Sequence, residues 1–264
     1  MRYSIAKNTA STKVKRTTTK HQPEMKNNKL ILALIAFLAF SNLVLAQNVE
    51  VLHRAERLPE YEAERFSFIA PDADTSRLQF VATLRATGVG KNANLEMVFN
   101  KLREKAQTLG GNAFKLRQFS RIDEFPKSIL TLDVYFASDS VLKLNHEKHS
   151  KNMVYIIGSP EKSDKTYSFK IDNLKKEIKG GTFYQHENKE GQEVKINKGG
   201  FTGTTVWIKW KKNKPATFLT LSGMAVLNTP PPPGQMGASI TTGRISYLDE
   251  NFGYLLLNVL AESK

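Results

Sequence analysis

The sequence predicts an α+β fold, in which a small strand–helix–strand–strand domain precedes an all-β sandwich domain. Apolar and polar residues alternate along Arg77–Thr87, as they do on a strand with one buried face. Apolar residues recur at helical spacing along Asn92–Leu109. From Met153 onward, short β-prone segments are separated by Gly, Pro and Asn at roughly the 8–12-residue spacing of sandwiches and barrels.

The helix and the strands that flank it make up the first predicted domain. Asn92 or Asn94 can cap the start of the helix, because a short side-chain oxygen accepts a hydrogen bond from the first turn. Two glycines, at 110–111, signal its end. Asn112–Phe119 and Ser128–Phe136 predict two more strands. We expect the helix to cover one face of the resulting sheet.

The second domain is predicted to consist of strands alone. These strands span 153–157, 166–171, 175–179, 182–187, 192–196, 204–210, 218–224, 239–247 and 253–260. Gly253–Leu260 is apolar nearly throughout, so we expect a central strand that is buried on both faces. Pro230–Pro233 predicts a rigid, extended loop.

Shifts in composition divide the chain into six predicted segments. Residues 138–152 are polar throughout and are interpreted as a linker. The full order is 1–24 a disordered leader or mis-annotated start, 25–46 a signal peptide, 47–74 an irregular segment with a short strand at Val49–Leu52, 75–137 the small α/β domain, 138–152 the linker and 153–264 the β-sandwich domain.

Residues 25–46 have the order of a secretory signal peptide. A positive start at Met25–Lys29 precedes the apolar run Leu30–Phe40, and the segment ends on the small residue Ala46. The alternative is an uncleaved membrane anchor, but the run is short for a span, which takes roughly 20 apolar residues. We therefore predict export to the periplasm or outer envelope of a bacterium, or secretion, with translation starting at Met1 or Met25 and no transmembrane segment after cleavage.

Charge and cysteine content narrow the function classes. Residues 1–46 hold eight of the 39 basic side chains and one of the 25 acidic ones, so the rest of the chain carries +7. This mild excess is weak evidence for a polyanion, and export argues against nucleic acid. The sequence contains no cysteine, which excludes disulfides, a lipoprotein anchor and a thiol nucleophile.

Two segments resemble known families of exported modules. Leu102–Leu116, with its flanking strands, resembles small bacterial envelope domains of the Rcs-sensor and putative heavy-metal-binding kind, in which a helix that ends in Leu-Gly-Gly-Asn-Ala leads into a strand. The resemblance implies an α/β sandwich, but the sensor's cysteines have no counterpart here. Val154–Leu221 resembles β-sandwich modules of the PEGA kind, carried by Tyr167–Ile171 and Lys176–Tyr184, and this implies an anchoring or binding role.

No catalytic, metal or cofactor site is predicted. The sequence lacks a Gly-x-Ser-x-Gly elbow, and no serine is singled out by its spacing to a histidine. His146 and His149, with Glu147 between them, can share one face of a helix and chelate a metal together. Because no third ligand is evident nearby, they are interpreted as solvated linker histidines.

The best candidate for a binding surface is the segment Thr204–Pro215. On a strand, Trp207, Lys209 and Lys211 share one face and can stack on a sugar ring or hold an anionic group. The alternative is that the tryptophan packs under a loop while the lysines protect a sheet edge.

We predict an exported, non-enzymatic envelope protein that binds an envelope protein, a glycan or an anionic headgroup. Two alternatives remain at this point, a small-ligand or metal-binding module and an enzyme with an unrecognised site. The sequence does not identify the partner or the oligomeric state.

Overall fold

The computed structural model describes residues 49–60, 63–122, 124–200, 203–222, 225–227, 239–241 and 243–263. All of them belong to one compact unit of the chain. The predicted signal peptide and the predicted proline loop lie outside the described residues. Within these residues, no helix has both the length and the hydropathy that a membrane span requires.

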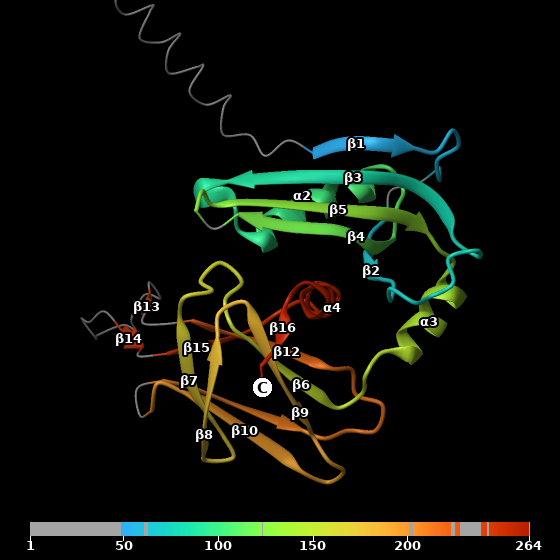
Figure 1. The fold of residues 1–264 in the computed structure, drawn as a ribbon. Helices are drawn as coiled ribbons and strands as arrows, with labels where there is room; N and C mark the ends of the chain where they lie inside the picture. Colours follow the sequence, from blue (N-terminus) through green and yellow to red (C-terminus); the bar gives the residue numbers. More distant parts are fainter. Residues whose placement is uncertain are drawn as a thin grey trace, which may run out of the picture. The chain divides into compact units, whose positions relative to one another are not determined.

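The first sheet has the strand order β1-β3-β5-β4-β2 (Figure 1). All neighbours are antiparallel except β2 and β4. The three strands predicted around the helix are confirmed as β3, β4 and β5, and the short strand predicted at Val49–Leu52 is confirmed as part of β1. The strand β2, in the segment otherwise predicted as irregular, was not predicted. The bounds are β1 Val49–Arg54, β2 Ser67–Phe68, β3 Gln79–Val89, β4 Ala113–Ile122 and β5 Lys127–Phe136.

The predicted helix is confirmed as α2, Leu95–Thr108, preceded by a 3₁₀ turn at Gly90–Asn92. The Asn94 side chain accepts a hydrogen bond from the backbone N–H of Met97 at 3.0 Å, so the second of the two predicted caps is the one used. The apolar face of the helix is buried against the sheet. Its larger buried side chains are Leu95, Val98, Phe99 and Leu102. Burial of each contributes roughly 1.5–3 kcal/mol of transfer free energy.

The segment predicted as a linker contains the helix α3, Asp139–Lys148. Its buried face consists of Leu142 and Asn145, and the Asn145 amide nitrogen donates to the carbonyl oxygen of Phe68 at 2.8 Å. A buried face that includes an asparagine gives almost no hydrophobic periodicity. The composition therefore indicated a linker although the segment is helical.

The second part of the chain forms two larger sheets, of strand order β11-β10-β7-β8 and β15-β12-β6-β9-β16, and a separate two-stranded sheet of β13 and β14. The predicted short strands between residues 153 and 222 are confirmed. Their bounds, with those that follow, are β6 Met153–Ile157, β7 Thr166–Ile171, β8 Leu174–Lys179, β9 Thr182–Glu187, β10 Glu193–Lys198, β11 Thr204–Lys209, β12 Thr217–Ser222, β13 Ala225–Leu227, β14 Ser239–Thr241, β15 Arg244–Tyr247 and β16 Ala261–Glu262.

Side chains from the two larger sheets meet in one buried cluster. Alternate residues point into it, as on β7, where three of six side chains are buried in strict alternation. The buried members are Val154, Ile156, Tyr167, Phe169, Ile171, Ile178, Val194, Ile196, Ile208, Leu219, Leu221 and Ile245.

The last apolar run is a helix, which corrects the prediction of a buried central strand at Gly253–Leu260. The helix α4 spans Glu250–Val259, and the Asp249 side chain caps it by accepting from the N–H of Phe252 at 3.0 Å. A short apolar run does not distinguish a buried strand from a buried helix by periodicity, and here the cap decides.

The helix α4 joins the two parts of the molecule (Figure 1). The ring of Phe252 lies 5.1 Å from that of Phe99 on α2, and the ring of Tyr254 lies 4.9 Å from that of Phe218 on β12. Residues of both parts thus belong to one hydrophobic cluster. The structure differs here from the predicted arrangement of two domains separated by a linker.

Candidate metal centre

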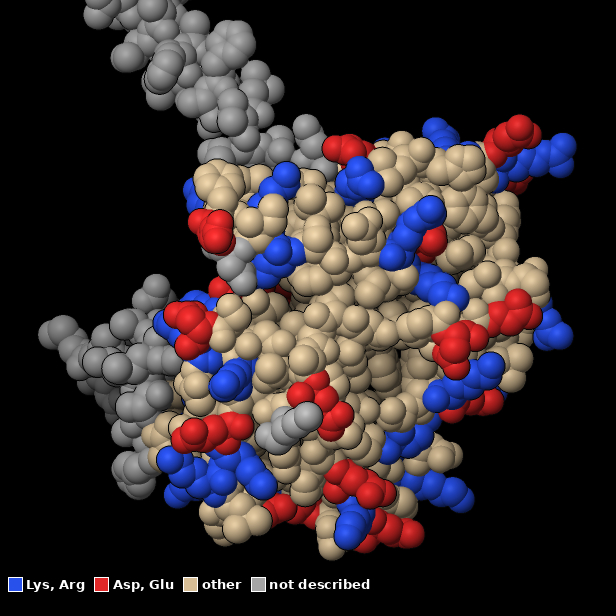
Figure 2. Space-filling model, in the orientation of Figure 1, with Lys and Arg blue, Asp and Glu red and all other residues tan. Residues whose placement is uncertain are grey.

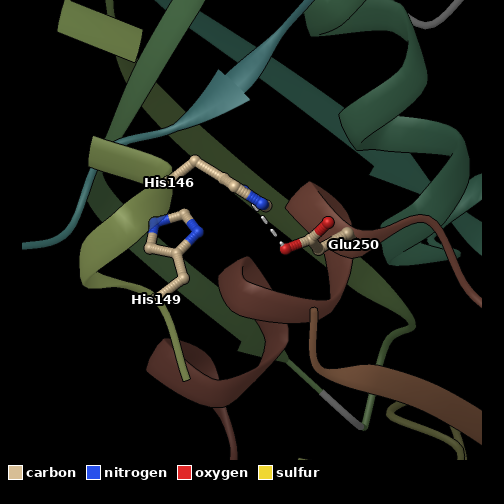
Figure 3. A group of neighbouring side chains, drawn as sticks. All are labelled: His146, His149 and Glu250. Carbon is tan, nitrogen blue, oxygen red and sulfur yellow. Dashed lines mark ion pairs between the residues drawn. The ribbon is translucent and has the colours of Figure 1, made fainter. Parts of the chain in front are cut away.

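Two histidines and a glutamate from separate helices converge at the junction of α3 and α4. His146 lies in the last turn of α3, His149 is the C-cap residue of that helix, and Glu250 is the first residue of α4. One potential ligand atom of each side chain lies within 4.8 Å of the others. Figure 3 shows the three side chains turned toward one another.

A single residue of the first sheet fixes both helices at this point. The backbone N–H of Phe68 donates to the side-chain oxygen of Asn251 on α4 at 2.9 Å, and its carbonyl oxygen accepts from Asn145 on α3 at 2.8 Å. The Phe68 ring stacks on Tyr254, with the centroids 5.9 Å apart. The convergence of the three donors is therefore a consequence of tertiary packing, not of local sequence.

The distance between the first two donors suits a shared ion better than a hydrogen bond. The Nδ1 atom of His146 lies 3.6 Å from Oε1 of Glu250, beyond the usual range for a hydrogen bond. Two ligands bound at about 2.0–2.1 Å to a tetrahedral ion lie about 3.3 Å apart. The other donor separations, which reach no more than 4.8 Å, would also have to shorten for the three atoms to share one ion.

Two polar atoms of the cluster are buried without a hydrogen-bond partner among the described residues. They are Nδ1 of His149 and Oε1 of Glu250. A buried polar atom left unsatisfied costs roughly 1–3 kcal/mol. Because both atoms face the same junction, one bound cation would satisfy them together.

The protonation equilibria of the cluster favour a neutral imidazole. Burial, together with His146 and Lys151, lowers the pKa of His149 to about 4, so its ring is uncharged at neutral pH. Burial also raises the pKa of the Glu250 carboxyl, against the opposing effect of His146 and Lys151. A metal ion binds the neutral form of histidine and the ionised form of glutamate.

The remaining surroundings leave Nδ1 of His149 available as a ligand. The Tyr254 ring covers the imidazole, with the centroids 4.3 Å apart. Coordination through Nδ1 requires the ring proton on Nε2, which lies 3.4 Å from the Asn145 amide nitrogen. Because an amide nitrogen can only donate, this long contact favours the opposite tautomer and would be given up when an ion binds at Nδ1.

The structure places the predicted binding residues on a different element. Trp207 is 57% exposed on β11, at one end of its sheet, and pairs with Lys195 of β10. Lys209 shares its outer face and lies 3.6 Å from Glu193, whereas Lys211 follows the strand. The exposure of Trp207 speaks against the alternative of packing under a loop.

The glutamate between the two histidines is not part of the cluster. Glu147, which lies between the two histidines, is exposed and outside the cluster. The third donor, for which the sequence offered no nearby candidate, is Glu250. Asp249, which caps α4, was the signal that Glu250 begins a helix. That signal is informative only if residues 250–259 are assigned as a helix.

No protein-family model, curated protein or solved structure matches this chain. The likeness to envelope domains thus stays a prediction. The functional assignment rests on the geometry of the described residues.

Proposed function

We propose that this protein is a non-enzymatic metal-binding protein that holds one divalent transition-metal ion of the zinc class between His146, His149 and Glu250. The observation that carries the proposal is the convergence of three donors within 4.8 Å, two of which present buried atoms that lack a hydrogen bond among the described residues. The two histidines lie at the end of α3, whereas the glutamate comes from α4, about 100 residues later in the chain.

The donor set selects the class of ion. Two imidazole nitrogens and one carboxylate oxygen suit zinc, nickel, copper or iron, whereas calcium and magnesium prefer all-oxygen sites. Thiolate-dependent ions are disfavoured because the chain has no cysteine. We therefore expect zinc to bind and calcium to leave the protein unchanged.

Isothermal titration calorimetry of the purified, chelator-treated protein tests this function. We expect one zinc ion per chain with a Kd of about 1 µM or tighter. His149→Gln and Glu250→Gln each remove a ligand of similar size and should weaken binding by at least about 100-fold. His53→Gln, on the exposed strand β1, is the matched control and should bind as the natural protein does.

Two results would contradict the assignment. The first is no heat of zinc binding in protein that shows a cooperative thermal transition. The second is zinc binding that is unchanged in both His149→Gln and Glu250→Gln.

A second candidate function is recognition of an envelope glycan by the outer face around Trp207. The specific observation is an exposed tryptophan ring beside Lys195, whose ammonium group can donate hydrogen bonds next to a stacking platform. On the face drawn in Figure 2, basic and acidic side chains are interspersed. Beside Trp207, Glu193 lies 3.6 Å from Lys209, so a neutral or mildly anionic sugar suits this face better than a polyanion. We infer that the two larger sheets act as a β-sandwich that presents this face.

Glycan binding is tested by tryptophan fluorescence during titration with cell-envelope oligosaccharides. Saturable quenching that disappears in Trp207→Ala supports the candidate function. Unchanged affinity in a folded Trp207→Ala, Lys209→Ala double variant excludes this face.

We also infer that the protein works outside the cytoplasm, because residues 25–46 carry the order of a signal peptide. Fractionation of cells that express the full chain tests this inference. Recovery in the periplasmic fraction with Gln47 at the N-terminus is expected, and intact chain in the cytosol would refute it.

A further inference from the structure

The proposed ion has fewer protein ligands than it needs. Zinc in proteins takes four ligands, and in the part of the chain that the structure describes only three donors gather at this point. The site is also accessible, because the side chains of His146 and Glu250 are 46% and 30% exposed. A fourth ligand can therefore come from solution.

Lys151 lies close to the same junction and is held there at both ends. Its ammonium group donates to the carbonyl oxygen of His146 at 2.8 Å, and its main chain bridges to Pro215. A cation is therefore already positioned beside the ligand set before any metal binds.

The charge balance with an ion bound is unfavourable unless an anion joins it. Two neutral imidazoles and one carboxylate leave a single positive charge on the ion with its ligands, and Lys151 adds a second. Such a net charge in a half-buried position is costly unless it is paired. A neutral water at the fourth position leaves this charge in place, and only its ionisation to hydroxide would remove one positive charge.

We propose that the fourth coordination position binds a small oxyanion, of the phosphate or carboxylate type, with Lys151 as its second contact. This inference rests on the proposed function, since the anion binds through the metal ion. An oxyanion matches both partners, because its oxygens can ligate the ion and accept hydrogen bonds from an ammonium group.

Cobalt(II) replaces zinc in the test, because its visible absorption reports on its ligands. The cobalt-loaded protein is titrated with sodium phosphate and with sodium acetate, and sodium perchlorate at matched ionic strength serves as the non-coordinating control. We expect a saturable spectral change with phosphate and acetate and none with perchlorate. In Lys151→Met the affinity for phosphate should fall by about tenfold.

Lys148→Met is the matched control, because Lys148 lies at the end of the same helix but lines a separate hollow with Asp74. It should bind phosphate as the natural protein does. A parallel titration with vesicles that carry a phosphomonoester headgroup, against phosphatidylcholine vesicles, separates a free oxyanion from a lipid headgroup. A spectral change with the vesicles alone would overturn the assignment to a small free ion.

Failures of metal binding, of oxyanion binding and of the role of Lys151 give different results in these titrations. Absence of cobalt uptake refutes the proposed function and the inference with it. Cobalt uptake with a spectrum indifferent to phosphate and acetate overturns the inference alone and leaves metal binding intact. A phosphate affinity that is equal in Lys151→Met and the natural protein overturns the role of Lys151.

Discussion

At the scale of single residues, the protein buries ionisable groups in two different ways. His149 is covered by Tyr254 and is neutral at neutral pH, so its burial does not require the desolvation of a charge. Lys198 is only 8% exposed, and no carboxylate partner is found for it among the described residues. Its ammonium group donates to the carbonyl oxygen of Ser168 at 3.2 Å and lies 5.3 Å from the ring centroid of Tyr167.

Burial lowers the pKa of Lys198, which predicts a pH-dependent stability. A lowered pKa means that the unfolded state binds the proton more tightly, so the free energy of unfolding should rise as pH increases toward the unfolded value of about 10.4. Lys198→Met removes the buried charge and should raise stability at neutral pH by about 1 kcal/mol.

Urea denaturation at several pH values from neutral to about 10 checks this prediction. The natural protein should become more stable relative to Lys198→Met as pH rises. A constant difference between the two proteins across the range would show that the lysine is not the titrating group.

At the scale of secondary-structure elements, most strands and the helix α2 could be predicted because each carries a local signal. Alternation reveals β7, and the spacing of apolar residues with Asn94 reveals α2. The helices α3 and α4 could not be predicted in the same way. The helix α3 buries an asparagine and has only a weak amphipathic period, whereas α4 is a short apolar run, which predicts a buried strand as readily as a buried helix.

The candidate metal site could be only half predicted for the same reason. The spacing of His146 and His149 allowed a chelating pair, but both were interpreted as solvated linker histidines, whereas the structure brings them within 4.8 Å of Glu250. The third donor depends on α4 being a helix and on both helices being fixed to Phe68. No single-sequence pattern reports such a tertiary contact.

The close approach of α4 to β12 requires a glycine. A Cβ atom at position 253 would lie 2.2 Å from the ring of Phe218, which is buried and cannot move aside. Gly253→Val should therefore destabilise the protein by about 2–4 kcal/mol through overpacking. The same change should weaken zinc binding, because it displaces the helix that carries Glu250.

Thermal denaturation and zinc titration of Gly253→Val check this prediction together. Gly191→Ala is a control at a turn where the added methyl group meets no atom within 4 Å, although its positive φ of 74° adds a small cost of its own. Equal melting temperatures of Gly253→Val and the natural protein would mean that α4 does not pack as closely as described.

At the scale of the whole molecule, the candidate metal site lies where the first sheet, α3 and α4 meet. The ion would bind α3, which connects the two parts, to α4, which packs against both. Zinc binding should therefore stabilise the junction of the two parts more than either part alone.

Zinc at about 100 times its Kd should add about 2.7 kcal/mol to the free energy of unfolding, which corresponds to a rise in Tm of roughly 5–10 °C. Native-state hydrogen exchange locates the effect. Protection should increase at the amides of α3 and α4 and at Phe68, whose N–H is bonded to Asn251. The strands β7 and β8, which belong to the other buried cluster, should respond least.

The control is Glu250→Gln, which keeps the helix but loses the ligand. It should show neither the rise in Tm nor the local protection. Protection spread evenly over the described strands, or confined to α3, would mean that the ion does not link the two helices.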